Sequence, residues 1–290
     1  MIATARQDRL SLPAIPALLW VSFRRRASRV AAVPVRSVAT TGRGVLMAAA
    51  VLRYAITDTL SLRLPFGELI VQAWTLFKVT ATPAVLMAIP IGATVSVEVS
   101  GLVNQLGASS LAGTASAVGV LRQGAPITAG LLMGGAAASA IASDLGARAI
   151  REELDALRSL GVDPVRRLVV PRFLALILIA PVLCVIIIAS AVAAAFILAV
   201  TVSDVTSGSF WMTFGAFAKT VDAWFAIGKT VIFGAIVAVI SSLRGMEAKG
   251  GPRGVADAVN SSVVLNTVSI VVVNLAITQL QAMFFPMEVS

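Results

Sequence analysis

The stretch Ala147-Arg-Ala-Ile-Arg-Glu-Glu-Leu-Asp-Ala-Leu-Arg-Ser-Leu-Gly-Val-Asp-Pro164 is the most densely ionic part of the chain, and long apolar runs flank it on both sides. Its apolar residues recur at helical spacing: Ile150, Leu154, Leu157 and Leu160. Gly161 suits a helix end, and the residue before Pro164 is sterically disfavoured from helix. The pattern predicts a short charged helix that connects two membrane spans, with one face packed and the other in contact with water, headgroups or another protein.

The composition on either side of this stretch is that of a membrane protein. Hydrophobic residues make up 58% of the chain and charged residues 13%, whereas about a quarter of a soluble domain is charged. Five runs reach the length of about 20 residues that a spanning helix needs: Val79–Val97, Gln123–Ser143, Phe173–Ser203, Ala258–Met287 and Ala223–Leu243, the last interrupted only by Lys229. No run alternates with period two, so we predict an all-α polytopic membrane protein with about five transmembrane helices.

The placement of charge predicts the orientation of these spans. The net charge is +9, and the basic residues gather in three blocks, with few between them: Arg24–Arg29, Arg148–Arg172 and Arg244–Arg253. Short cytoplasmic loops carry an excess of Lys and Arg. We therefore predict a multi-pass protein of the cytoplasmic (inner) membrane, with its N-terminus inside and its C-terminus outside. The basic blocks also suit anionic headgroups, and we expect no nucleic-acid partner.

The chain divides by composition into a basic N-terminal segment, residues 1–64, and a membrane domain, residues 65–290. Within the first, four residues beside the arginines suit an interfacial helix, with a disordered basic tail as the alternative: Leu18, Leu19, Trp20 and Phe23. The segment Pro65–Lys78 places apolar residues on one stripe and predicts a second interfacial helix that leads into the first span.

Small residues fill the second predicted span, including a Gly130-x-x-x-Gly134 pair. Because small residues let helices approach closely in a bilayer, we expect this helix to be central. The link before it, Ser100–Gln123, is rich in glycine and serine, and we expect a re-entrant or interfacial helix there at the outer surface.

Several kinds of chemistry lack the residues that they need. The chain has no histidine, and its one cysteine, Cys184, lies within a predicted span. The tripeptide Gly228-Lys-Thr230 is not a phosphate-binding loop, because position 223 is Ala where that pattern requires Gly. We therefore expect no enzyme activity, metal or cofactor on this chain, and we expect Lys229 to extend toward the interface.

The charged segment leaves two interpretations open on chemistry alone. Glu152, Glu153 and Asp155 form an acidic edge that arginine or lysine of a soluble subunit could bind. The same residues would also suit a solvated loop helix.

Two motifs favour the first interpretation. The first runs Asp144-Leu-Gly-Ala-Arg-Ala-Ile-Arg-Glu-Glu-Leu-Asp-Ala-Leu157 and continues through Gly161-Val-Asp-Pro164 to Arg167-Leu-Val-Val-Pro-Arg172. The second is Arg244-Gly-Met-Glu-Ala-Lys-Gly-Gly-Pro-Arg-Gly-Val-Ala-Asp-Ala-Val-Asn260. Together they resemble the MlaE/YrbE family of ABC-transporter permeases over roughly residues 65–285, and most resemble the actinobacterial YrbE A-type subunit of Mce lipid transporters.

This resemblance implies a coupling helix that is gripped by a cytoplasmic ABC ATPase dimer, which would carry ATP and Mg. The residues that it assigns to ATPase coupling are Arg151, Glu152, Glu153, Asp155, Ala156, Leu157, Leu160 and Gly161. The second cytoplasmic motif, expected to pack near that helix, contributes Arg244, Gly245, Lys249, Gly250, Gly251 and Gly254. The implied partners are a second YrbE-like permease of the B type, Mce-domain substrate-binding proteins and a lipid (fatty acid, phospholipid or sterol).

The sequence departs from the family in places that bear on the substrate. Gln123 stands where many relatives carry an acid, Leu243 where they carry an aromatic residue, and Ser241 and Ser242 where they carry Cys or Ala. A candidate substrate cavity at the outer end of the first span contains Glu98, Asn104 and Gln105; a position of Glu98 among the headgroups is the alternative.

Two other functions remain open at this point. An ion-coupled secondary transporter without an ATPase needs ionisable residues deep in the bundle, for which Glu98, Lys229 and Asp222 are the candidates. An intramembrane lipid enzyme needs a metal cluster, a histidine or a pair of buried acids, and none is evident in the sequence.

Overall fold

A computed structural model describes residues 42–61, 66–105, 112–202 and 205–284, and this part of the chain is helical, with turns but no strand. The chain divides into two units after Leu46, and the account below concerns residues 47–290. After a helix over residues 42–60 come α2 (Phe66–Gln105), α3 (Ala112–Val118), the π-helical turn η2 (Gly119–Gly124), α4 (Ala125–Leu132), η3 (Met133–Ala137), α5 (Ala138–Ile150), α6 (Glu153–Ser159), η4 (Val165–Val169), α7 (Val170–Val202), α8 (Ser207–Phe217), α9 (Thr220–Met246) and α10 (Pro252–Phe284).

The five predicted spans are confirmed, because five helical segments in the described residues are long and apolar enough to cross a membrane. They are Phe66–Glu98, Ser116–Ile150, Val165–Val202, Thr220–Met246 and Pro252–Phe284. The helical segments are longer than the uncharged runs because polar residues form additional helical turns at their ends. Arg166 in η4 and Arg172 at the start of α7 are examples. The all-α polytopic fold is therefore confirmed.

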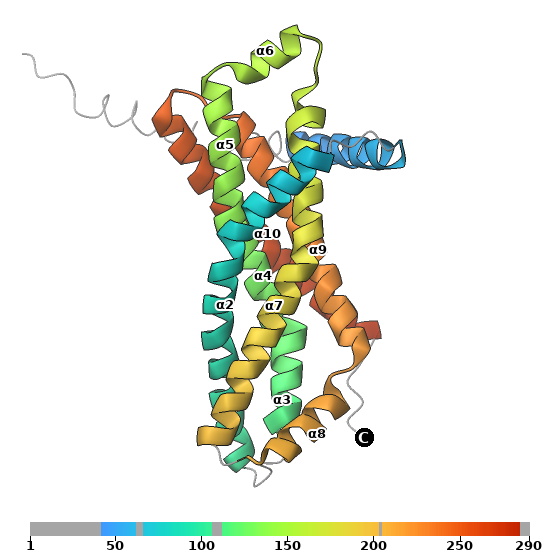
Figure 1. The fold of residues 1–290 in the computed structure, drawn as a ribbon, viewed down its shortest axis with the longest axis vertical. Helices are drawn as coiled ribbons and strands as arrows, with labels where there is room; N and C mark the ends of the chain where they lie inside the picture. Colours follow the sequence, from blue (N-terminus) through green and yellow to red (C-terminus); the bar gives the residue numbers. More distant parts are fainter. Residues whose placement is uncertain (1–41, 62–65, 106–111, 203–204, 285–290) are drawn as a thin grey trace, which may run out of the picture. The chain divides into compact units, whose positions relative to one another are not determined.

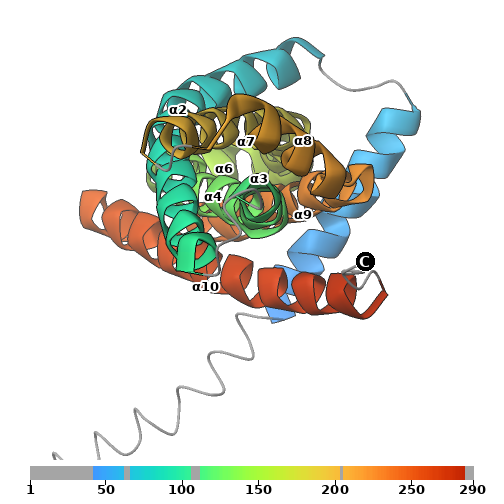
Figure 2. The same cartoon turned by 90° about the horizontal axis from the view of Figure 1, so that it is seen from below.

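The second span is central, as its small residues predicted. Seen along the bundle, α3 and α4 lie in the middle, with α2, α7, α9 and α10 around them (Figure 2). A Cβ atom on Gly130 would lie 2.7 Å from the Phe233 ring and 2.8 Å from Ile270. One on Gly134 would lie 2.9 Å from Ile270. Side chains at these two positions would push α9 and α10 away from the centre.

The predicted interfacial helix over residues 65–78 is wrong as a separate element, because residues 66–105 form the single helix α2. Figure 1 shows the first part of α2 tilted against the rest. Pro83 and Pro90 lie inside the helix. A proline has no backbone N–H and its ring crowds the preceding turn, so it bends a helix, but the helix continues when the surrounding hydrogen bonds are kept.

The re-entrant or interfacial helix expected over residues 100–123 is also wrong for the described residues of that link. From Ala112 onward the chain runs without a break through α3, η2 and α4, so this segment is the first part of the second span. Its partner is α8, a helix that the sequence did not predict, at the opposite end of the bundle from α6 (Figure 1). Phe210, Trp211 and Phe214 of α8 form a ring cluster with Phe196 of α7.

The N-terminal prediction is only partly covered. Leu18, Leu19, Trp20 and Phe23 lie outside the described residues. The helix over residues 42–60 was not predicted; in the compact unit, Met47, Val51 and Ala55 of this helix enter the same core as the spans, while Leu52, Ile56 and Leu60 on other faces are exposed.

Candidate functional site

The charged segment is two helices rather than one. Helix α5 ends at Ile150, and Glu152 has a left-handed backbone conformation (φ 59°) before α6 begins at Glu153. Leu154 is buried as predicted, but the break turns the end of α6 outward and leaves Leu160 77% exposed. Gly161, with φ 75°, follows the helix end and confirms the predicted termination there. Helix α6 lies at the far end of the bundle, beyond α5 and the start of α7 (Figure 1).

A chain of ion pairs fixes the start of α6 to two spans. The Arg172 side chain of α7 is only 2% exposed, and its guanidinium pairs with Asp144 of α5 and donates to the Leu168 carbonyl. Asp144 also pairs with Arg148, with N and O atoms 3.3 Å apart. Arg148 Nη1 then lies 3.5 Å from Glu153, and Glu153 lies 2.9 Å from Arg151. This ionic chain, Arg172–Asp144–Arg148–Glu153–Arg151, links α7, α5 and α6.

The acidic residues of the segment therefore differ in their surroundings. Glu153 belongs to the ionic chain and its side chain is 40% exposed, whereas Glu152 is exposed and the Asp155 side chain is 71% exposed. Asp155 makes a surface pair with Arg158, with Nη1 and Oδ1 2.7 Å apart. Ala156 and Leu160 are exposed, and Leu157 is partly buried. Only part of the expected acidic edge is thus accessible to another protein.

The second motif packs on α5, the helix that leads into α6. A Cβ atom on Gly245 would lie 2.9 Å from both the Ala142 carbonyl oxygen and Leu145, so this glycine lets α9 approach α5 closely. Gly250 and Gly251 have φ of 83° and 79°, which turn the chain from α9 into α10. A Cβ on Gly254 would collide with the Lys249 carbonyl, and Lys249 itself is exposed. Arg244 pairs loosely with Glu247, 3.9 Å away.

A buried polar network lies nearer the α8 end, and the sequence analysis did not identify it. Asp222 pairs with Arg122 Nε, 2.9 Å away, and accepts a hydrogen bond from Gln281. Lys229 Nζ donates to the Arg122 carbonyl and to Thr278, at 3.1 and 3.0 Å. Gln123 donates to Thr278 and accepts from Asn274. We call these seven residues the α9–α10 polar network.

The expectation that Lys229 extends to the interface is wrong, because its side chain is 1% exposed. Lys229 instead donates to the carbonyl of Arg122 in η2, which lacks its usual donor four residues on because Pro126 has no N–H. The signal available in the sequence was the coincidence of Arg122, Asp222 and Lys229 in otherwise uncharged spans.

The candidate cavity residues at the end of α2 are not brought together by any described contact. Glu98 is exposed on α2. Asn104 and Gln105 belong to the last turn of α2, and their side chains lie outside the described part of the chain.

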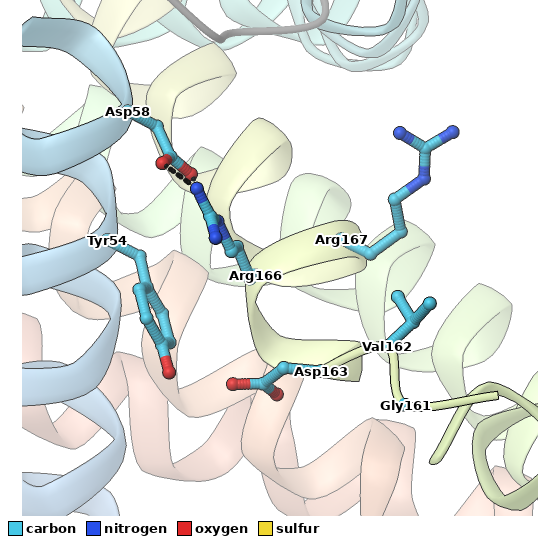
Figure 3. Close-up of a pocket in the computed structure, with 7 residues that line it drawn as sticks. All are labelled: Tyr54, Asp58, Gly161, Val162, Asp163, Arg166 and Arg167. Atoms are coloured by element: carbon cyan, nitrogen blue, oxygen red, sulfur yellow. Dashed lines mark hydrogen bonds and ion pairs between the residues drawn. The ribbon is translucent and has the colours of Figure 1, made fainter. Parts of the chain in front are cut away.

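A cavity opens beside the turn that follows α6 (Figure 3). It is lined by Tyr54, Asp58, Gly161, Val162, Asp163, Arg166 and Arg167. Arg166 Nε lies 3.0 Å from Asp58. The hydrogen bond from the Tyr54 hydroxyl to Asp163, and the negative charge of that carboxylate, raise the pKa of Tyr54 above its usual value.

Comparison with known proteins identifies the framework that carries these features. Residues 69–280 match the family model of permease MlaE, and this range contains both motifs and the α9–α10 polar network. The chain belongs to the MlaE permease family.

Relatives of this MlaE-family chain include permeases from bacteria and a chloroplast protein. A probable ABC transporter permease protein of Rickettsia felis is 29% identical over 177 residues, which cover 61% of this chain and 68% of the relative. The intermembrane phospholipid transport system permease protein MlaE of Haemophilus influenzae is 31% identical over 51% of this chain and 57% of its own. The Arabidopsis thaliana chloroplast protein TRIGALACTOSYLDIACYLGLYCEROL 1 is 29% identical over 60% of this chain and 50% of its own.

Proposed function

We propose that this chain is the membrane subunit of an ATP-driven lipid transporter, in which a cytoplasmic ABC ATPase dimer moves the spans through α6. The observation that carries the proposal is the ionic chain that joins α6 to α5 and α7. The names of two relatives support it, since one is a probable ABC transporter permease and the other is the permease of an intermembrane phospholipid transport system. ATP and Mg would be bound by the ATPase and not by this chain.

The geometry suits α6 as a lever. The exposed residues Asp155, Ala156 and Leu160 provide a charged and apolar contact for the ATPase. The inward residues Glu153 and Leu154 hold the helix to the spans. The Arg172–Asp144 pair joins α7 to α5, and Arg148 connects Glu153 of α6 to the same carboxylate, so a displacement of α6 would be transmitted to both spans.

The orientation and partners complete the proposal. Basic residues at the α6 end, among them Arg148, Arg167 and Arg253, favour a cytoplasmic location for that end, with the N-terminus inside and the C-terminus outside. On the motif resemblance, we assign the chain to the actinobacterial YrbE A-type subunits. Its partners would then be a second permease of the B type and Mce-domain proteins, with the lipid handled near Glu98, Asn104 and Gln105.

The second candidate is an ion-coupled secondary transporter, and the observation that favours it is the buried trio of Arg122, Asp222 and Lys229. The two functions differ in their need for an ATPase. Lipid transport that continues in a strain whose cognate ATPase is inactive would support the second.

The test measures uptake of a labelled lipid by cells that carry Glu152→Lys together with Asp155→Lys. Both side chains are exposed, so the protein should reach the membrane at normal level, and uptake should fall at least tenfold because the charge of the ATPase contact is reversed. Asp257→Lys, an exposed acid at the start of α10, is the matched control and should leave uptake unchanged. Normal uptake in the double variant would contradict the coupling role.

A further inference from the structure

The cavity beside α6 shares only Gly161 with the residues assigned above to ATPase coupling. Its volume is about 470 Å³. Its walls come from the helix over residues 47–60, the turn after α6 and the first residues of η4, as Figure 3 shows. These segments are far apart in the sequence, and the bond between Arg166 and Asp58 holds them together.

The charged groups of the cavity differ in whether they are paired. The Asp58 side chain is almost fully buried and pairs with Arg166. Asp163 accepts from the backbone N–H of Val165 at 2.9 Å. Both carboxylates are thus engaged. Arg167 is exposed and makes no ion pair with any residue that the structure describes; its guanidinium extends away from the Asp58–Arg166 pair (Figure 3). Two carboxylates and two guanidiniums therefore line the cavity, and Arg167 is the guanidinium that no described carboxylate pairs with.

The position of the cavity favours a lipid. The helix over residues 47–60 exposes Leu52, Ile56 and Leu60 at four-residue intervals, and Arg53 is exposed next to them. Apolar residues and arginines exposed together on one helix are typical of helices that lie in the membrane interface. On the other wall, Arg166 and Arg167 belong to the first turn of the span Val165–Val202. The cavity thus opens where headgroups meet the hydrocarbon.

We propose that this cavity binds the phosphate-bearing headgroup of an anionic lipid from the leaflet at the α6 end, with Arg167 as its charged contact. A guanidinium matches the oxygen atoms of a phosphate with two parallel hydrogen bonds. The lipid chains would extend along the exposed apolar residues of the helix over residues 47–60. Which leaflet supplies the lipid rests on the orientation given in the proposed function. The presence of the site does not depend on that orientation.

The experiment uses the full chain, without an ATPase, in phosphatidylcholine nanodiscs that contain phosphatidylglycerol. Native mass spectrometry after release counts the phosphatidylglycerol molecules that each protein retains. Arg167→Ala should weaken retention of one phosphatidylglycerol molecule about tenfold or more, as loss of a charge-assisted hydrogen bond implies. Arg253→Ala, which removes another exposed arginine at the same end, should behave as the wild type.

A second variant should act in the opposite direction. Asp58→Asn keeps the size of the side chain and an oxygen that can accept from Arg166, so the walls stay joined, but it removes a negative charge from the cavity, so retention of phosphatidylglycerol should rise. A variant that only damaged the fold would not tighten binding.

Three results would overturn the proposal. Equal retention of phosphatidylglycerol by the wild type and Arg167→Ala would show that Arg167 forms no lipid site. Loss of the bound lipid in millimolar inorganic phosphate would assign the site to free phosphate. Unchanged retention, combined with loss of ATPase binding by Arg167→Ala, would assign the cavity to a protein partner. Because lipid retention is measured without an ATPase, failure here leaves the coupling role untouched, and failure of the uptake test leaves this site untouched.

Discussion

Asp144 is the residue on which the link between the spans and α6 depends. It pairs with the buried guanidinium of Arg172 and with Arg148. Asp144→Asn should lower the stability of the isolated permease by about 2 kcal/mol, less than for a fully buried pair because the Asp144 side chain is 42% exposed. The melting temperature in detergent measures this effect. Asp155→Asn, which removes an exposed carboxylate of α6, is the control and should not change it; an equal fall in both variants would refute the role of Asp144.

Asp222 has a similar place in the α9–α10 polar network, where it is the only carboxylate beside two cations, Arg122 and Lys229. Asp222→Asn leaves both cations buried without a counter-charge, so the melting temperature should fall further than for Asp144→Asn, corresponding to about 3–5 kcal/mol. Adding Arg122→Gln should restore part of the loss, because one of the two uncompensated charges is then removed. If the double variant is less stable than Asp222→Asn alone, the ion pair with Arg122 is not the interaction through which Asp222 stabilises the protein.

The two clusters differ in how far the sequence could predict them. Helical spacing and charge density placed a charged helix near residues 150–160, since both are local properties. The bond from Lys229 to the Arg122 carbonyl depends on a π-helical turn and on two helices 107 residues apart in sequence, so the tendency of an isolated lysine to reach toward water gave the wrong position.

At the level of the elements, the close approach of α9 to α5 positions the second motif. Gly245→Ala would place a methyl group 2.9 Å from the Ala142 carbonyl oxygen and should lower stability by about 1–3 kcal/mol. Gly228→Ala is the matched control on the same helix, where nothing lies within 4 Å of the new atom, and it should be neutral or stabilising. The melting temperatures of the two variants check this; no difference between them would contradict the tight α5–α9 contact.

The elements that the sequence misplaced share one cause. Residues 65–78 have an amphipathic pattern, which suggested a separate helix, yet α2 continues beyond them and through both of its prolines. The break at Glu152 has no glycine or proline to mark it, and Glu153 after the turn pairs with Arg148 and Arg151 before it. Such boundaries depend on tertiary contacts that no local pattern contains.

For the whole molecule, five spans and the MlaE permease family follow from apolar length and from two motifs, and both are confirmed. Neither the apolar length nor membership of the family identifies the partner proteins. The structure limits how they can bind: the exposed side of α6 offers Asp155 and Leu160, while the inward side is occupied by the ionic chain.

The most direct test of the coupling role is therefore the protein composition of the assembly purified from the native host. The tagged wild-type chain should bring an ABC ATPase and a second permease in fixed proportion, as quantified by mass spectrometry. Leu160→Asp, a change at a side chain that is 77% exposed, should keep the permease partner and lose the ATPase. Absence of any ATPase from the wild-type assembly, or undiminished ATPase recovery with the variant, would contradict coupling through α6.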